Sequence, residues 1–105
     1  MNKRLMVALL AAPLATWVAP AQANPEEAMT KAGCMACHAK DKKMVGPSFQ
    51  QIAAKYKGQD VKATLVKKVR EGGKGNFGPI PMAPNPPDKI SDADLGEAVG
   101  WILKQ

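Results

Sequence analysis

The sequence predicts an all-α domain built from four short helices joined by loops. Apolar residues recur at helical spacing in several stretches, for example at Phe49, Ile52, Ala53 and Tyr56. No stretch shows the alternation of apolar and polar residues that is expected of a half-buried strand. Between the apolar stretches lie Gly, Pro, Asn, Asp and Ser residues, which commonly mark the ends of helices.

The first predicted helix begins at Asn24, whose side chain is suited to cap it. Pro25 then occupies the first helical position, where its missing N–H group costs nothing. Glu27 completes the spacing of a capping box. The helix is expected to continue through residues 28–32 toward Cys34.

Two further helices are predicted in the middle of the chain. Residues 49–56 form the first, which Gly58 ends, and Asp60 is expected to cap the next. Residues 72–73, both Gly, end that second helix. Its apolar side consists of Val61, Leu65 and Val69.

The last predicted helix begins at Ser91, with Asp94 three residues on in the spacing of a capping box. Its apolar stripe consists of Leu95, Ala98, Val99 and Ile102, with Trp101 beside it. Such stripes form the core of a domain more often than they serve a function, so we expect these residues to be buried.

Residues 72–87 join the last two helices and contain five Pro and four Gly residues. A composition of this kind is typical of disordered segments. The competing interpretation is a rigid loop, in which the fixed φ angles of Pro81 and Pro84 hold the intervening Met82 in one place.

Cys34, Cys37 and His38 form a Cys-x-x-Cys-His motif, the pattern on which haem is covalently attached. Each thiol can add to one vinyl group of the porphyrin, and the imidazole can bind the iron from the same side. A dithiol redox centre is disfavoured because no βαβ pattern lies nearby. A zinc site lacks a second cysteine pair, since these are the only two Cys and the only His. A structural disulfide remains an alternative in an oxidising compartment.

The sixth iron ligand is predicted to be Met82. With one His in the chain, a second imidazole is excluded. Three methionines lie too close to the attachment motif in the chain, namely Met29, Met35 and Met44. Met82 follows His38 by 44 residues and can cross the other face of the haem. Lysines and Tyr56 remain formal alternatives. A His–Met pair raises the reduction potential and fills the iron's coordination sphere, which favours electron transfer over catalysis.

The sequence has few large apolar residues, and a buried cofactor would compensate for this. Val, Ile, Leu and Phe make up only 14 of residues 24–105, below the usual share of a globular chain. Small domains bury a smaller fraction of their surface, so a porphyrin would supply much of the core. We therefore expect the haem-free chain to be largely unfolded.

Residues 1–23 are predicted to be a cleaved secretory signal peptide. Residues 3–4 are basic, residues 5–19 are an apolar run, and residues 21–23 have the small-x-small pattern of a cleavage site. The alternative is an uncleaved membrane anchor, but the run is shorter than the ~20 residues of a membrane span. Haem is normally attached outside the cytoplasm, so the mature domain, residues 24–105, is expected in the bacterial periplasm.

The mature domain would carry a net charge of +4, from thirteen Lys and Arg against nine Asp and Glu. Its lysines are spread along the chain without an arginine-rich tract or interleaved aromatic residues, which argues against nucleic-acid binding. They form either an ordinary solvated surface or a partly basic face that guides docking to acidic redox partners.

Taken together, these motifs resemble class I c-type cytochromes, and most closely the small bacterial cytochrome c-551 type. The similarity covers essentially the whole mature chain and rests on residues 34–38, 44–47 and 78–82 and on Trp101. It implies the class I cytochrome c fold, with four short helices and loops wrapped around one covalently attached haem. The first and last helices would cross, and one haem edge would be exposed.

The resemblance also implies the site residues. The thioethers would form at Cys34 and Cys37, and the axial ligands would be His38 and Met82. Pro47 is similar to the proline whose carbonyl accepts a hydrogen bond from the proximal imidazole. Asn85 is similar to the residue that hydrogen-bonds the axial sulfur.

Two positions depart from the family pattern. Phe77 stands where the family often has a Trp whose N–H group reaches a haem propionate. Lys68 corresponds to a frequent Arg, so Lys68 or Arg70 is a candidate to pair with a propionate.

The function implied is that of a periplasmic, monomeric, monohaem electron carrier that is not an enzyme. A quinol-oxidising complex or another cytochrome would reduce it, and a nitrite reductase, oxidase or peroxidase would accept its electron at the haem edge near Val45, Pro47 and Met82. Stable membrane insertion is not expected. Two alternatives stay open: a catalytic or sensory protein whose Met82 leaves the iron, and a thiol redox protein without haem.

Overall fold

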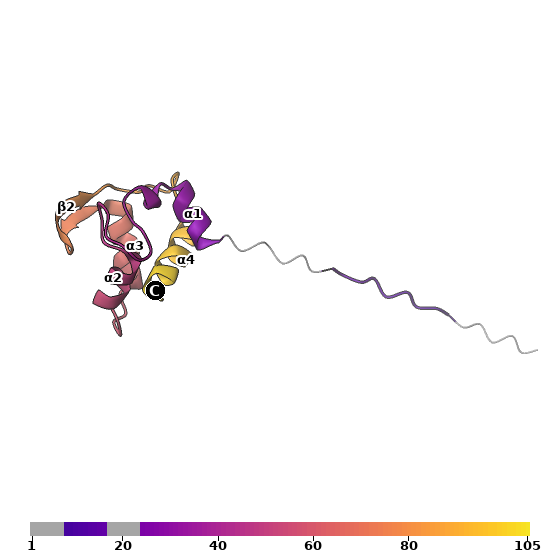
Figure 1. The fold of residues 1–105 in the computed structure, drawn as a ribbon. Helices are drawn as coiled ribbons and strands as arrows, with labels where there is room; N and C mark the ends of the chain where they lie inside the picture. Colours follow the sequence, from indigo (N-terminus) through magenta and orange to yellow (C-terminus); the bar gives the residue numbers. More distant parts are fainter. Residues whose placement is uncertain (1–7, 17–23) are drawn as a thin grey trace, which may run out of the picture.

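The computed structural model describes residues 8–16 and 24–105, and most of its regular structure is helical (Figure 1). Residues 8–16 belong to no helix or strand, and their side chains are exposed. The basic start and the cleavage site of the predicted signal peptide, residues 3–4 and 21–23, lie outside the described residues. Among the helices of the described ranges, none has the length and apolar character needed to cross a membrane.

Helix α1 (Pro25–Lys31) begins as the sequence predicts, at Asn24, whose Oδ1 accepts a hydrogen bond from the Glu26 N–H group (3.0 Å). The predicted capping box is wrong, because the carboxylate of Glu27 pairs with Lys31 one turn later (3.1 Å). The helix ends before the cysteine motif, where Gly33 adopts a left-handed conformation (φ 84°). A separate 3₁₀ turn, η1 (Cys34–Ala36), then carries the motif.

Helix α2 (Phe49–Lys55) has a complete capping box that the sequence analysis did not identify. Ser48 Oγ accepts from the Gln51 N–H group (3.0 Å), and Gln51 Oε1 accepts from the Ser48 N–H group (2.8 Å). This reciprocal pair fixes the start of α2, and with it the buried Phe49.

Helix α3 (Lys62–Glu71) begins at Val61 without any side-chain cap, so the prediction that Asp60 caps this helix is wrong. The helix starts one residue later than a cap at Asp60 requires. It ends as predicted at Gly72, which has a positive φ of 71°.

A small antiparallel hairpin follows, formed by β1 (Gly73–Gly75) and β2 (Gly78–Met82). The sequence analysis did not identify these strands, because neither shows the alternation of apolar and polar residues on which it relied. Gly residues with positive φ turn the chain back, so that Gly73 lies opposite Met82. The two prolines of β2 are tolerated because each strand of a two-stranded sheet is an edge strand. The hairpin supports the rigid-loop interpretation of this segment over disorder.

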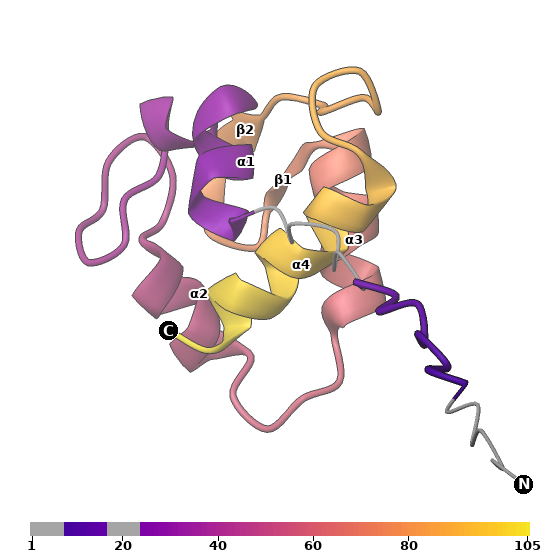
Figure 2. The ribbon, with the colours of Figure 1, turned by 90° about the vertical axis from the view of Figure 1, so that its right-hand side faces the viewer.

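Helix α4 (Asp92–Leu103) begins at Ser91, whose Oγ accepts from the Asp94 N–H group (3.1 Å), and this confirms the predicted start. Helix α4 lies at the centre of the domain and contacts α1, α2 and α3 (Figure 2). The core is formed by Met29, Ala32, Phe49, Ile90, Leu95, Ala98 and Val99. The predicted all-α class is therefore confirmed, with the hairpin as an addition to it.

Candidate haem-binding site

A cavity of about 290 Å³ lies between the helices and the hairpin. Most of its lining is apolar, and its walls come from η1, the loop before α2, the helices and the hairpin. All four residues predicted to hold the haem line this one cavity: Cys34, Cys37, His38 and Met82. The fold thus brings the cysteine motif together with a methionine 44 residues away from His38 in the chain.

The imidazole of His38 is fixed by three contacts. Its Nδ1 lies 2.7 Å from the carbonyl oxygen of Pro47, and its ring stacks on Phe49 with the ring centres 5.6 Å apart. The third neighbour is Gly46, where an added Cβ would lie 2.5 Å from Cε1 of the imidazole. A carbonyl oxygen only accepts hydrogen bonds, so Nδ1 is the donor, and in the neutral imidazole Nε2 then has the lone pair that a metal needs.

The two thiols differ in exposure. Cys34 is half-buried and Cys37 is exposed, and they are not joined to each other. Burial raises the pKa of the Cys34 thiol, because desolvation disfavours the thiolate. Across residues 8–16 and 24–105, no cluster of three or more His, Cys, Asp or Glu side chains could hold a metal ion.

Met82 ends strand β2 and is half-buried at the cavity. The backbone that follows it packs tightly on the end of α3, since a Cβ on Gly72 would come within 2.9 Å of the Pro84 nitrogen. Gly72 therefore has two reasons to lack a side chain, its positive φ and this close approach.

Asn85 does not line the cavity, but it ties the segment after Met82 to α3. Its Nδ2 donates to the carbonyl oxygens of Val69 (3.2 Å) and Ala83 (3.1 Å). Its backbone N–H group donates to the carbonyl oxygens of Val69 and Arg70. Both amide hydrogens of Asn85 thus have carbonyl acceptors, and a bond to the Met82 sulfur stays a prediction that requires one of them to be exchanged.

Of the two cations considered as propionate partners, only Lys68 lines the cavity. Its Nζ lies beside Gly73, where an added Cβ would be 2.7 Å away. Arg70 is committed elsewhere, because its guanidinium donates to the carbonyl oxygens of Asn85 and Ile90 and pairs with Asp92.

Phe77 lines the cavity and contacts Tyr56 and Lys55. Its ring meets Tyr56 edge-on with the ring centres 6.3 Å apart, and Lys55 Nζ lies 4.5 Å from its ring centre. The same ammonium donates to the carbonyl oxygen of Asn76. This cation–π contact and hydrogen bond hold the hairpin turn, and Phe77 has no N–H donor for a propionate.

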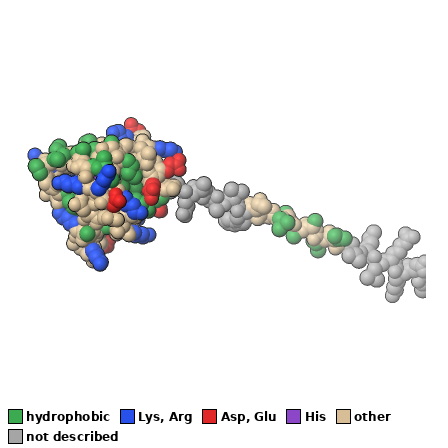
Figure 3. Space-filling view, viewed as in Figure 1, with side chains coloured by type: hydrophobic (Ala, Val, Ile, Leu, Met, Phe, Trp, Pro, Cys, Tyr) green, Lys and Arg blue, Asp and Glu red, His purple; other side chains and the backbone are tan. Residues whose placement is uncertain are grey.

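The rim of the cavity exposes apolar side chains to solvent. Val45, Phe77 and Ile80 line the cavity and are 52%, 40% and 59% exposed. Figure 3 shows Lys and Arg side chains distributed over the visible face, with hydrophobic side chains between them. On this face the basic residues are spread out, and an apolar rim beside a cavity is typical of a docking surface.

These observations fit a haem. The cavity is apolar enough to take a porphyrin, and the donor set combines two thiols, one imidazole with a free nitrogen lone pair and one thioether. The tight space between Gly46 and the imidazole holds the ring in one orientation, as a metal ligand requires.

Comparisons with known proteins identify the family of this chain. Residues 22–105 match the family model described as Cytochrome c. The chain is 53% identical over 83 residues to "Cytochrome c2" of Rubrivivax gelatinosus, an alignment covering 78% of this chain and 98% of that relative. It is 47% identical over 79 residues to "Cytochrome c-551" of Azotobacter vinelandii, covering 74% and 93%. The crystal structure of Nitrosomonas europaea cytochrome c552 is similar, with a TM-score of 0.69 and 40% identity over 75% of this chain and 96% of that one.

Proposed function

Because this chain belongs to the cytochrome c family and is a monohaem electron carrier, we propose that it works in the periplasm with its iron held between His38 and Met82. The observation that carries this proposal is that His38, Met82 and both cysteines line a single apolar cavity. Haem c, the cofactor of this family, supplies one-electron chemistry when it is bound.

The cysteines provide the covalent attachment in this proposal. Cys34 and Cys37 would hold the haem through two thioethers. Each thioether would form by addition of the S–H group across one vinyl group, which needs no oxidant or reductant. The half-buried Cys34 begins the short turn η1, and the exposed Cys37 directly follows it.

His38 and Met82 have separate roles. The N–H group at Nδ1 of His38 donates a hydrogen bond to the Pro47 carbonyl oxygen, and this bond orients the ring so that Nε2 would be the atom that binds the iron. The thioether of Met82 is a soft, neutral donor that favours the ferrous state and raises the reduction potential. If His38 and Met82 both hold the iron, small molecules would have no open position on it, which would suit an electron carrier.

The partners are proposed by chemistry. A quinol-oxidising complex or another cytochrome would donate the electron, and a nitrite reductase, oxidase or peroxidase would accept it. The exposed apolar rim at Val45, Phe77 and Ile80 would form the centre of a small, transient interface. The lysines spread over the surface would guide acidic partners to the protein.

Replacing Met82 by Ala in the haem-containing protein tests the ligation. The Met–iron charge-transfer band of the ferric protein, near the red end of the visible spectrum, should disappear, and the reduced protein should bind carbon monoxide rapidly at neutral pH. Met44→Ala is the matched control, because Met44 is 42% exposed and does not line the cavity. If Met82→Ala keeps the band, the sixth ligand is a different residue.

The proposed localisation has its own test. Protein isolated from the periplasm should begin at Asn24, as N-terminal sequencing would show. An intact N-terminus on the haem-containing protein would contradict the proposed cleavage after residue 23.

A further inference from the structure

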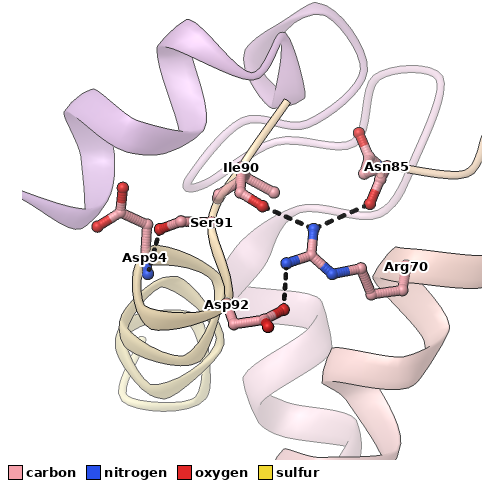
Figure 4. A network of polar contacts seen from close by, with 6 residues as sticks. All are labelled: Arg70, Asn85, Ile90, Ser91, Asp92 and Asp94. Carbon is pink, nitrogen blue, oxygen red and sulfur yellow. Dashed lines mark hydrogen bonds and ion pairs between the residues drawn. The ribbon is translucent and has the colours of Figure 1, made fainter. Parts of the chain in front are cut away.

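Arg70, on the last turn of α3, joins three parts of the chain (Figure 4). Its Nη1 donates to the carbonyl oxygens of Asn85 (3.1 Å) and Ile90 (2.6 Å), and its Nη2 pairs with Oδ1 of Asp92 (2.6 Å). The side chain of Arg70 is only 16% exposed. One guanidinium therefore connects α3, the segment 83–90 and the first turn of α4.

Asn85 is held by α3 from the other side as well. Its backbone N–H group and its side-chain amide donate to carbonyl oxygens at the end of α3, which have no partner within the helix. Its own carbonyl oxygen accepts from Arg70. The backbone N–H group, the side-chain amide and the carbonyl oxygen of Asn85 thus all bond to α3, and they fix the chain three residues after Met82.

These bonds matter for Met82 because they add hydrogen bonds to the close packing of residues 83–84 on Gly72 at the end of α3. The hairpin holds Met82 from the N-terminal side through its pairing with Gly73. On the C-terminal side, the chain has prolines that cannot donate hydrogen bonds and an exposed stretch, residues 86–89. Among the described residues, the hydrogen bonds between segment 83–90 and α3 are those made by Arg70 and Asn85.

We propose that Arg70 is a positioning residue for Met82: its guanidinium clamps segment 83–90 against α3 and so keeps the thioether at the cavity. The proposal rests on the proposed role of Met82 as iron ligand. The two carbonyl bonds carry the effect. Asp92 is 91% exposed, and an ion pair to such a carboxylate contributes little.

The test uses the ferric haem-containing protein and imidazole as a competitor for the position of Met82. In Arg70→Met, both carbonyls lose a charged donor, and we expect imidazole to bind roughly ten-fold faster or more, since such bonds are among the stronger ones. The Met–iron charge-transfer band should also weaken. Arg70→Lys keeps one charged donor and should fall between Arg70→Met and the parent, whereas Asp92→Asn should bind imidazole nearly as the parent does.

A general loss of stability is separated by a control. Asn24→Ala removes the side-chain cap of α1, far from this segment in the chain, and should destabilise the fold without touching the clamp. The proposal is overturned if Arg70→Met binds imidazole no faster than Asn24→Ala at equal denaturation midpoint, or if Arg70→Lys restores nothing. If Met82→Ala loses the band but Arg70→Met binds imidazole as the parent does, the role of Arg70 is wrong while the ligation by Met82 stands. Retention of the band in Met82→Ala would instead remove the ligation on which it rests.

Discussion

Gly46→Ala is predicted to destabilise the haem-containing protein, because the new methyl group would collide with the imidazole of His38. The added Cβ would lie 2.5 Å from Cε1 and 2.9 Å from Nδ1 of that ring. Gly46 does not have a positive φ, so the substitution introduces no backbone strain of its own. Any effect of the substitution therefore reports the contact with the ring.

The size of the effect follows from these distances. Carbon atoms in contact are normally about 3.5–4.0 Å apart, so the ring or the loop must move by about 1 Å. Movement of the ring stretches its 2.7 Å bond to Pro47, and movement of the loop stretches the 2.8 Å bond from the Gly46 N–H group to the Cys37 carbonyl oxygen. Overpacking together with one weakened hydrogen bond costs about 2–4 kcal/mol. For a domain of this size, the melting temperature should fall by roughly 10–30 °C.

Thermal unfolding followed by circular dichroism measures this change, and the NMR resonance of the His38 Nδ1 proton reports the bond to Pro47. Gly96→Ala is the matched control. Gly96 lies inside α4, and a Cβ there would meet nothing within 4 Å. That variant should gain about 1 kcal/mol from helix propensity and melt at a higher temperature. If Gly46→Ala melts as the parent does, with an unchanged Nδ1 resonance, the imidazole is not held as the structure indicates.

Three further predictions follow from the site. Gly72→Ala should weaken the Met–iron charge-transfer band, since a Cβ there would strike the backbone after Met82; a band of parent intensity in the visible spectrum would contradict this. Lys68→Gln should lower the reduction potential measured by spectroelectrochemistry, because a cation lining the cavity favours the ferrous state. Lys67 is exposed and does not line the cavity, so Lys67→Gln should change the potential less. Haem-free protein made with Cys34→Ala and Cys37→Ala should lose most of its helical far-UV signal, and native helicity in that protein would show that the core forms unaided.

The sequence predicted best what is encoded by neighbouring residues. The attachment motif spans five residues, so its chemistry can be read without the fold. The start of α4 was equally local, since Ser91 caps the N–H group three residues on. Met82 was predicted because the other methionines lie too close in the chain, and the structure places it at the same cavity as His38.

The features that the sequence did not predict depend on contacts between distant residues. The hairpin lacks the alternation that marks a strand, and it forms because Gly residues turn the chain back and Gly73 meets Met82. Arg70 was considered only as a propionate partner, yet it binds carbonyls 15 and 20 residues away. Backbone carbonyls occur at every residue, so no sequence pattern marks them as the acceptors of a particular arginine.

The core and the cavity share residues, and this connects the stability of the fold to the cofactor. Leu95 and Val99 are each 2% exposed and belong to the core cluster, yet both also line the cavity. The inner face of α4 is therefore the wall against which a porphyrin would pack. Without that partner, the cavity exposes apolar surface to water, and a chain with so few large aliphatic residues has little other core to offset the entropy of folding. Substitutions at Leu95 should consequently change both the melting temperature and the haem environment, although this residue is neither a predicted ligand nor a neighbour of one in the chain.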